Sequence, residues 1–252
     1  MLMAWNVGEL LDGPLPLWWQ IADRLRRAIE RGEFRPGDAV PSEAQLNAAF
    51  GVSRTTARAA LDELSQEGLI SRKPGIGSIV LKPRVEQPLT RLAGFADDMR
   101  QRGLTASYRT FAVRMDRPED DVAVALGIVG DSRALRITRL LIADGQPMAL
   151  AESWLNPAAL NGAAPPAPAD LDDRSLYSWL ESTCGARIVG GTQTIEATIA
   201  DRALGERLCV EIGSPVLVAR RRSHDLKLEA IEYVVISYRA DRYRFTIDLE
   251  RR

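Results

Sequence analysis

The sequence predicts an α+β protein in two parts: a small winged helix-turn-helix domain, then a larger domain built on an antiparallel sheet with helices. Helical periodicity dominates residues 14–84, whereas strand patterns separated by glycine turns dominate residues 93–252. One hairpin pattern in the second part occurs twice, which favours a single sheet with two related halves. The chain has 252 residues, and at roughly 100–200 residues per domain this length suits two domains.

The first predicted helix covers residues 18–31 and follows a short N-terminal arm at residues 1–13. Ile21, Leu25 and Ala28 recur at three- and four-residue spacing, so one face of the segment is apolar. We therefore expect an amphipathic helix that packs this face against the rest of its domain.

A second and a third helix follow, and each begins at a serine that can cap it. Ser42 and Gln45 have the spacing of a capping box. Ser53 is placed to cap the third helix, which is expected to end near Gly68. Two helices joined by a short turn, with a third before them, predict a helix-turn-helix motif.

Two short strands are expected to complete the N-terminal domain. They lie around residues 69–71 and 78–81 and are joined by a tight turn, P-G-I-G, at residues 74–77. A hairpin directly after a helix-turn-helix motif is a wing, so residues 14–84 are predicted to form a winged helix-turn-helix domain.

The start of the third helix is crowded with hydroxyl and guanidinium groups, while its other face is small and apolar. In a helix-turn-helix domain this end of the helix contacts base edges and phosphates in the major groove. Solvated polar residues at a capped helix start would explain Ser53, but they explain the whole cluster and the glycine-rich wing poorly. The candidate DNA-binding residues are Ser53, Arg54, Thr55, Thr56, Arg58, Lys73 and Gly75.

The charge distribution adds little to this prediction. Residues 14–84 hold 11 Lys and Arg against 8 Asp and Glu, whereas residues 85–252 hold 22 against 24. A basic surplus is compatible with phosphate contacts, but ordinary fluctuation explains a difference of this size equally well.

Few residues could support metal or redox chemistry. Cys184 and Cys209 are far apart, no C-x-x-C motif occurs, and His224 is the one histidine. We therefore expect no metal, no cofactor and no disulfide scaffold, as is usual for a cytoplasmic protein. No apolar run approaches the roughly 18 residues of a membrane span, so no membrane partner is expected.

After a linker at residues 85–92, the second domain is expected to begin with a helix over residues 95–102 and a strand over residues 105–115. A pattern of helix end, glycine turn, strand, polar turn and strand then occurs at residues 124–153 and again at residues 206–233. Two related antiparallel hairpins of one sheet are therefore predicted. The crease between such halves is a natural ligand site.

Charged residues on otherwise apolar strand faces mark where the ligand would lie. The repeat aligns Arg139 with Arg221 and Glu152 with Glu232, and Glu232 shares its strand face with Tyr238. Buried charges are costly unless they are paired, so these residues could surround a polar ligand. A structural ion pair or a partly solvated sheet edge explains any one of them as well.

The N-terminal motifs resemble a known family. The segments P-L-W-W-Q-I, R-P-G-D-A-V-P-S-E, F-G-V-S-R-T-T-A-R-A-A-L-D-E-L, E-G-L-I and G-I-G-S are similar to the DNA-binding domain of GntR-type bacterial transcription regulators. The resemblance implies a homodimer on palindromic double-stranded operator DNA. It also departs at Ala44, where many relatives have an arginine that contacts DNA.

The C-terminal motifs resemble the effector domain of the HutC branch of that family, the UTRA domain of chorismate-lyase-like fold. The segments are I-T-R-L-L-I-A-D-G-Q-P-M-A-L, S-L-Y-S-W-L-E and I-E-Y-V-V-I-S-Y-R-A-D-R-Y-R-F. The resemblance implies effector binding and dimerisation by residues 93–252. It places Arg139, Ser175, Glu232 and Tyr238 on positions that line the effector pocket.

Two further details bear on the pocket. Tyr177 suits either the pocket or the core, and Leu141 stands where several sugar-phosphate-sensing relatives have a second arginine, which weakens a bidentate phosphate clamp. We therefore favour an effector other than a phosphosugar. The candidate effector-binding residues are Arg139, Glu152, Ser175, Tyr177, Glu232 and Tyr238.

Together these features predict a cytoplasmic transcription regulator, most simply a repressor released from its operator by a small-molecule effector. Two alternatives remain open: a DNA-binding dimer without an effector, and a lyase-like enzyme. The enzyme is the weaker alternative because the sequence offers no nucleophilic triad or metal motif, and catalysis would leave the DNA-binding head unexplained.

Overall fold

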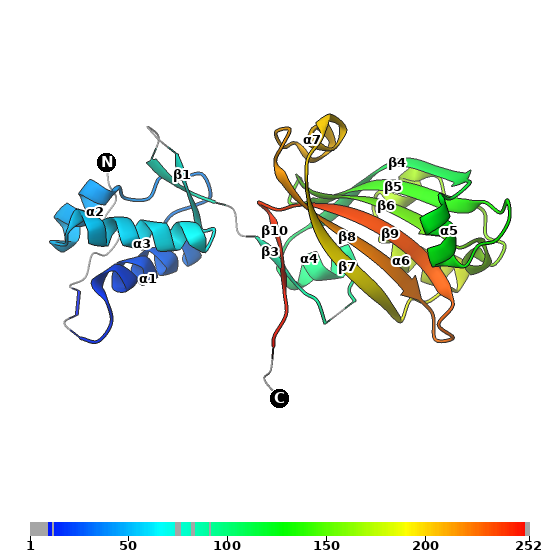
Figure 1. The fold of residues 1–252 in the computed structure, drawn as a ribbon, viewed down its shortest axis with the longest axis horizontal. Coiled ribbons are helices and arrows are strands. Elements are labelled where there is room, and N and C mark those ends of the chain that lie inside the picture. The colour runs from blue at the N-terminus through cyan, green and yellow to red at the C-terminus, as the bar shows by residue number, and fades with distance from the viewer. Residues whose placement is uncertain (1–9, 12, 74–76, 82–83, 91, 250–252) are drawn as a thin grey trace. The chain divides into compact units, whose positions relative to one another are not determined.

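The chain folds into two compact units, the first ending at Arg84 and the second beginning at Val85 (Figure 1). Both units combine helices with antiparallel strands, which confirms the predicted α+β class. None of the helices among the described residues is long and apolar enough to cross a membrane. The computed structural model describes residues 10–11, 13–73, 77–81, 84–90 and 92–249.

Three helices and a two-stranded hairpin form the N-terminal unit, in the predicted order. The hairpin strands pair antiparallel, with Ile70 opposite Val80. The elements are α1 (Leu17–Glu30), α2 (Glu43–Phe50), α3 (Arg54–Gln66), β1 (Ile70–Lys73) and β2 (Gly77–Val80).

The predicted caps are present at the starts of α2 and α3. The Ser42 side chain accepts from the Gln45 amide, and the Gln45 side chain accepts from the Ser42 amide, which completes a capping box. Between the helices, Gly51 ends α2 with φ of 65°, a left-handed conformation that glycine adopts without strain. These local interactions fix the sharp turn of the helix-turn-helix motif.

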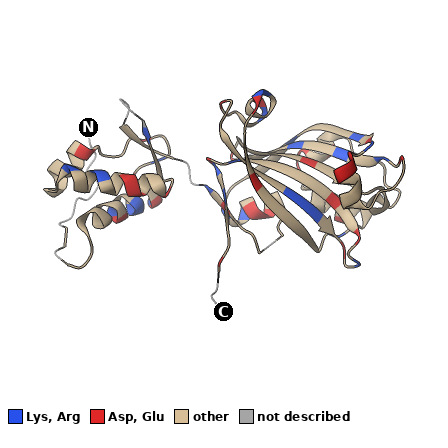
Figure 2. Cartoon of the chain, in the orientation of Figure 1, with Lys and Arg blue, Asp and Glu red and all other residues tan. Residues whose placement is uncertain are grey.

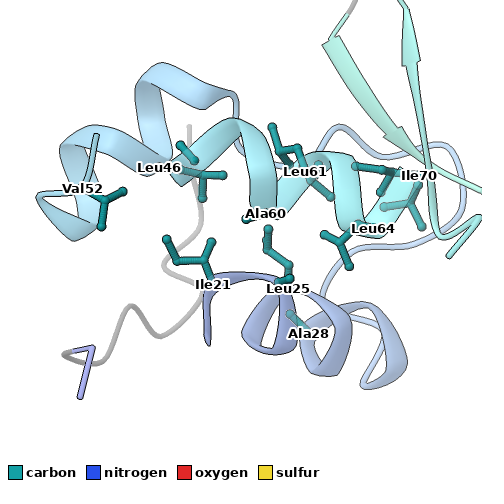
Figure 3. Close-up of a cluster of buried hydrophobic side chains, with 13 residues drawn as sticks. Ile21, Leu25, Ala28, Leu46, Val52, Ala60, Leu61, Leu64 and Ile70 are labelled. Carbon is teal, nitrogen blue, oxygen red and sulfur yellow. The ribbon is translucent and has the colours of Figure 1, made fainter. Parts of the chain in front are cut away.

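A single apolar core holds the three helices and the hairpin together (Figure 3). Ile21 and Leu25 of α1 meet Leu61 and Leu64 of α3, and Leu46 closes the core from α2. All five side chains are almost completely buried. This burial uses the apolar face of α3 and leaves the opposite face to solvent.

The C-terminal unit contains a six-stranded antiparallel sheet in the order β4-β5-β6-β9-β8-β7 and a separate parallel pair, β10-β3. The first segments are β3 (Val85–Pro88), α4 (Phe95–Gln101), β4 (Ala106–Asp116), α5 (Asp120–Leu126), β5 (Ala134–Ala143) and β6 (Gln146–Leu155). Two short helical turns, at Pro157–Leu160 and Pro168–Leu171, lead to α6 (Leu176–Trp179) and a π-helical turn, Leu180–Cys184. The last segments are β7 (Gly190–Ile199), α7 (Arg202–Leu208), β8 (Pro215–His224), β9 (Ala230–Arg239) and β10 (Tyr243–Thr246).

The predicted internal repeat is present and is longer than the sequence pattern suggests. Each half of the sheet contains a strand, a helix and a hairpin, as β4-α5-β5-β6 and as β7-α7-β8-β9. The two hairpins meet at the central strands β6 and β9, so the halves are related by a pseudo-twofold axis. Figure 1 shows the curved sheet that results.

The segment expected to be a linker is partly ordered strand. Residues 85–88 form β3, which pairs in parallel with β10, with Val85 opposite Tyr243. The segment V-E-Q-P does not look like a strand in the sequence, because the two buried positions are Val85 and Gln87 and just one of them is apolar. The C-terminal unit therefore begins with β3, at Val85.

Candidate functional site

The exposed start of α3 carries most of the candidate DNA-binding residues. The Ser53 hydroxyl accepts from the Thr56 amide at 3.1 Å and lies 2.8 Å from the Thr56 hydroxyl. Arg54, Thr55 and Arg58 are exposed. Capping thus occupies Ser53 and Thr56 in part, while the exposed side chains of Arg54, Thr55 and Arg58 can reach phosphates or base edges.

An arginine in the wing connects β1 to both helices of the motif. Arg72 forms ion pairs with Glu43 at the start of α2 and with Asp62 in α3. Arg58 lies 3.7 Å from Asp62, with its side chain 68% exposed. Arg72 thereby offsets the acidic charge beside Arg58 and fixes the wing against the helices.

The remaining predictions for this surface are only partly covered by the structure. Lys73 is the last residue of β1, and Gly75 lies outside the described residues. Ala44 lies in the first turn of α2, where a methyl group cannot contact a phosphate by hydrogen bonding.

In the C-terminal unit, one face of the sheet carries a cavity that is closed by α4, α6, β3 and β10. Five of the six candidate effector-binding residues line it: Arg139, Ser175, Tyr177, Glu232 and Tyr238. They come from β5, from α6 and its N-cap, and from β9, so residues about one hundred positions apart meet at one place.

Arg139 is a buried cation without a carboxylate partner in hydrogen-bonding contact. Its Nη2 donates to the main-chain oxygens of Leu171 at 2.5 Å and Arg174 at 2.8 Å, and its guanidinium lies 3.9 Å from the ring centre of Tyr108. Its Nε has no partner among the described residues. Burial lowers the pKa of Arg139 to about 10, so the group stays charged at neutral pH.

Glu232, a second charged group of the cavity, is compensated by neighbouring side chains. Its carboxylate, 2% exposed, accepts from the Ser153 hydroxyl at 2.8 Å and the Tyr177 hydroxyl at 3.3 Å, and lies 3.9 Å from Arg221 Nη2. Arg221 Nη2 also donates to the Tyr177 hydroxyl at 2.8 Å. Tyr177 therefore bridges the arginine and the carboxylate.

Burial also shifts the tyrosines of this network. It raises the pKa of Tyr177, with the neighbouring Glu232 carboxylate adding to the rise, and it raises the pKa of Tyr238 to about 12. Burial would lower the pKa of Arg221, but Tyr177 and Glu232 outweigh it and raise the pKa. All of these groups keep their neutral-pH charge: tyrosines neutral, arginine positive.

A second polar group joins the cavity to β3. The Tyr243 hydroxyl lies 2.9 Å from Gln87 Oε1 and 3.3 Å from Asp98 Oδ2, and all three residues line the cavity. Asp98 forms an ion pair with Arg102 at 3.0 Å. Through Gln87, the wall of the cavity thus includes the first strand after the boundary between the units.

Ser175 contributes its hydroxyl from the start of α6. The Ser175 Oγ accepts from the Ser178 amide at 3.0 Å and so caps the helix while it lines the cavity. Its position at the cavity wall was predicted from the family resemblance. Strand periodicity could not have predicted it, because Ser175 precedes a helix.

Glu152 is a correction to the expected site, because it lies on the opposite face of the sheet. It pairs in register with Thr138, one residue out of phase with Arg139. Its carboxylate forms an ion pair with Arg136 at 2.5 Å beside Trp154. The side chain therefore points away from the cavity, and we leave Glu152 out of the proposed site.

The register also corrects the repeat alignment. Arg139 faces Ala151 on β6, and Arg221 faces Val234 on β9, so these two arginines are equivalent. Two residues before these facing positions, β6 has Ala149 and β9 has Glu232. The counterpart of Glu232 is therefore an alanine, so β6 supplies no carboxylate to Arg139.

The structure adds cavity residues that the sequence interpretation missed. Arg221 was visible as the repeat partner of Arg139 and could have been found by carrying its role across the repeat. Tyr108, Ser153 and Asp98 gave no usable signal, because single polar residues in strands and short helices are common on any sheet.

The cavity combines buried guanidinium groups with side-chain hydroxyls. Arg221 pairs with Glu232 and Arg102 pairs with Asp98, whereas Arg139 has no carboxylate in salt-bridge contact and interacts with Asp172 and Glu232 only at longer range. No group of three or more potential metal ligands occurs among the residues that the structure describes. Hydroxyls from Ser153, Ser175 and Tyr177 offer hydrogen bonds to the rest of a small polar molecule.

Comparison with protein families places both units. Residues 18–80 match the profile of bacterial regulatory proteins of the gntR family, and residues 101–244 match the profile of the UTRA domain.

Several curated proteins are similar over nearly their whole length. The HTH-type transcriptional repressor NagR of Bacillus subtilis is 33% identical over 95% of this chain and 97% of its own. The mannosyl-D-glycerate transport/metabolism system repressor MngR of Escherichia coli is 29% identical over 95% and 98%. The histidine utilization repressor of Pseudomonas putida is 27% identical over 86% of each chain.

Among solved structures, PhnF from Mycobacterium smegmatis has a TM-score of 0.66 at 26% identity. The similarity covers 92% of this chain and 100% of the PhnF chain. This chain therefore shares the fold of PhnF over nearly all of its residues.

Proposed function

Because the chain belongs to the GntR family of bacterial transcription regulators, in the HutC subfamily with a UTRA domain, we propose that it is a repressor that a small anionic metabolite releases from a palindromic operator. Its relatives are transcriptional regulators, so the enzyme alternative is dropped. The observation that carries the proposal is Arg139, a buried guanidinium that lines the cavity and has no carboxylate in salt-bridge contact.

The proposed operator contact is the start of α3. Arg54 and Arg58 project from an exposed helix end whose backbone amides also favour phosphate, so both can neutralise phosphates or read guanine. A homodimer would present two such helices to two half-sites, and such a protein would act in the cytoplasm, where the operator is.

Operator selection tests this part directly. Random double-stranded DNA retained by the wild-type protein should yield a palindromic consensus. Arg54→Ala should then cost about 1–3 kcal/mol of binding to that site without a change in thermal stability. Arg27→Ala is the matched control, because it removes an arginine of α1 whose side chain is 64% exposed. Equal losses in both variants would contradict a specific role for α3.

The proposed effector carries one anionic group that binds Arg139 and a hydrogen-bond donor that reaches Glu232. Glu232 is the acceptor at the other end of the network, next to Ser153 and Tyr177. Leu141 lies in the cavity wall near Arg139 and offers no second guanidinium at that position, which favours a carboxylate over a phosphoryl group. The names of the relatives point to different metabolites, so none is transferred to this chain.

We further propose that release is a population shift. An effector acts only through a difference in affinity between the operator-binding and the released arrangements of the dimer. Gln87 makes this possible, because it lines the cavity and lies on β3, three residues after the boundary at Arg84. An effector that displaces the Tyr243–Gln87 hydrogen bond would alter the strand that leads to the DNA-binding unit.

The experiment for the effector is a thermal-shift screen with three ligand classes: carboxylates, phosphonates and sugar phosphates. A ligand at 100 times its dissociation constant should stabilise the protein by about 2.7 kcal/mol. The same ligand should release the selected operator in a mobility-shift assay. A ligand that stabilises the protein but leaves the operator bound would contradict the repressor mechanism.

A further inference from the structure

The wing contains an arginine, Arg72, whose guanidinium binds two carboxylates on two different helices. Its Nη1 donates to Asp62 in α3, and its Nη2 donates to Glu43 at the start of α2. The terminal nitrogens of a guanidinium lie in one plane and point in different directions, so one arginine can hold two acidic groups at once. Arg72 thereby joins β1 to both helices of the helix-turn-helix motif.

The strand pattern of the wing directs Arg72 towards the helices. Ile70 is 1% exposed in the core, and Arg72 lies two residues later in β1, so both side chains leave the same face of the strand. At Arg72 this face reaches the margin of the core, where the side chain is 31% exposed. Pairing with Ser78 of β2 holds this position in register. The hairpin therefore fixes the place from which the guanidinium meets its two carboxylates.

The carboxylate of Asp62 lies between Arg72 and a candidate DNA-binding residue, Arg58. Its Oδ1 accepts from Arg72, whereas its Oδ2 lies 3.7 Å from Arg58 Nε, which is too far for a hydrogen bond. Arg58 precedes Asp62 by one helical turn, and a pair with the cation on the N-terminal side is the weaker orientation in a helix. Arg72 therefore occupies Asp62, and Arg58, with its side chain 68% exposed, is available to a phosphate or a base edge.

We propose that Arg72 is a positioning residue for operator binding: by holding Asp62, it prevents Arg58 from pairing within α3 and leaves Arg58 to contact DNA. An arginine paired with a neighbouring carboxylate must give up that pair before it neutralises a phosphate, and the carboxylate also repels the phosphate. Arg72 reduces both costs without touching the DNA. This inference rests on the proposed operator contact of α3 and assigns the control of that contact to the wing.

The first test is binding of the full-length protein to the operator that wild type selects from random DNA. Arg72→Met removes the charge, so Asp62 pairs with Arg58 and operator affinity should fall about tenfold, as expected for one arginine contact. The plot of log K against log salt should become shallower by about 1 for each phosphate contact that Arg58 loses. Arg72→Lys keeps a charge beside Asp62 and should lose less affinity. Fluorescence anisotropy at several salt concentrations measures both quantities.

Two double variants separate this role from loss of structure and from net charge. Asp62→Asn added to Arg72→Met removes the competing carboxylate, so operator affinity should return to that of wild type. Glu43→Gln added to Arg72→Met gives the same net charge and also removes a partner of Arg72. Among the described residues Glu43 forms its ion pair with Arg72 and not with Arg58, so operator affinity should stay low in this matched control. Melting temperatures of the two double variants should be similar.

The second test asks whether Arg72 acts through Arg58. Residues that act through one another give losses that do not add, so Arg72→Met should cause no further loss of operator affinity in an Arg58→Ala background. Asp62→Asn alone keeps the wing arginine and removes its competitor, and it should bind the operator at least as tightly as wild type. This single variant keeps the inference testable even where Arg72→Met does not fold.

The outcomes separate this inference from the proposed function. Equal recovery with Glu43→Gln and Asp62→Asn would indicate a long-range charge effect and would overturn the positioning role. Unchanged affinity in Arg72→Met, recovery with neither double variant, or additive losses with Arg58→Ala would overturn it as well. In each of these cases wild type still binds its operator, so the repressor proposal stands. A wild type that selects no palindromic site would contradict the proposed function itself, and this inference with it.

Discussion

The two halves of the sheet place an arginine at equivalent positions, yet the two arginines have different partners. Arg221 donates to Tyr177 and lies 3.9 Å from Glu232, whereas Arg139 donates only to main-chain carbonyls. The facing strand supplies Glu232 in one half and Ala149 in the other. One residue of this duplicated framework therefore decides whether the facing strand supplies a carboxylate to the buried cation.

The largest expected effect comes from breaking the balanced half. Arg221→Met leaves the Glu232 carboxylate buried without its cation, and removing one partner of a buried pair typically costs about 3 kcal/mol. Urea denaturation should show this loss in the free energy of unfolding. The double variant with Glu232→Gln should recover most of it. Equal stability of wild type and Arg221→Met would mean that the 3.9 Å pair contributes little.

The same substitution in the other half should behave differently. Arg139→Met removes a cation that has no carboxylate in salt-bridge contact but leaves the main-chain oxygens of Leu171 and Arg174 without their donor, so the free energy of unfolding should fall by about 1–2 kcal/mol, less than in Arg221→Met. Effector affinity should fall tenfold to a hundredfold, because a charge-assisted hydrogen bond contributes about 1.5–3 kcal/mol. Titration calorimetry with a ligand from the screen measures the affinity. A large loss of stability would instead make Arg139 a structural residue.

Burial of Tyr238 should make the stability of the protein depend on pH in the alkaline range. Its pKa is about 12 in the folded protein, raised by burial from its ordinary value of about 10. A raised pKa contributes stability that is complete below about pH 10 and is lost as pH rises towards 12. Tyr238→Phe should therefore reduce the decline in stability between pH 10 and 11 by about 1 kcal/mol. Parallel melting curves for wild type and variant across this range would contradict the burial of Tyr238.

The smallest effect is expected on the far face of the sheet. Glu152→Gln breaks an ion pair with Arg136 whose two side chains are about one-third exposed, and exposed pairs contribute about 0–1 kcal/mol. Effector affinity and operator release should be unchanged, as measured in the same assays. A loss of response would return Glu152 to the site from which the sheet register removes it.

Periodicity predicted most of the fold. Ser42 and Ser53 fixed the helix starts, and the repeated hairpins predicted a two-part sheet, because caps and alternation are local properties of the chain. Residues 85–88 were missed as a strand, since β3 depends on pairing with β10 about 158 positions away. Short parallel pairs leave no local pattern.

The cavity was harder to predict than the fold. Arg139 and Glu232 stood out as charges on apolar strand faces, whereas Glu152 looked the same and lies on the other face. The register between β5 and β6 decides which face Glu152 occupies. Because this register shifts between Leu141 and Ile142, the face cannot be predicted from alternation alone. Figure 2 shows the further difficulty that charged residues are spread over the whole C-terminal unit, so charge by itself does not mark the site.

The most direct test of the central claim is differential scanning fluorimetry of wild type, Arg139→Met and Glu152→Gln against carboxylates, phosphonates and sugar phosphates. At least one anion should raise the melting temperature of wild type and Glu152→Gln and leave that of Arg139→Met unchanged. An anion that stabilises Arg139→Met as strongly as wild type would contradict this claim.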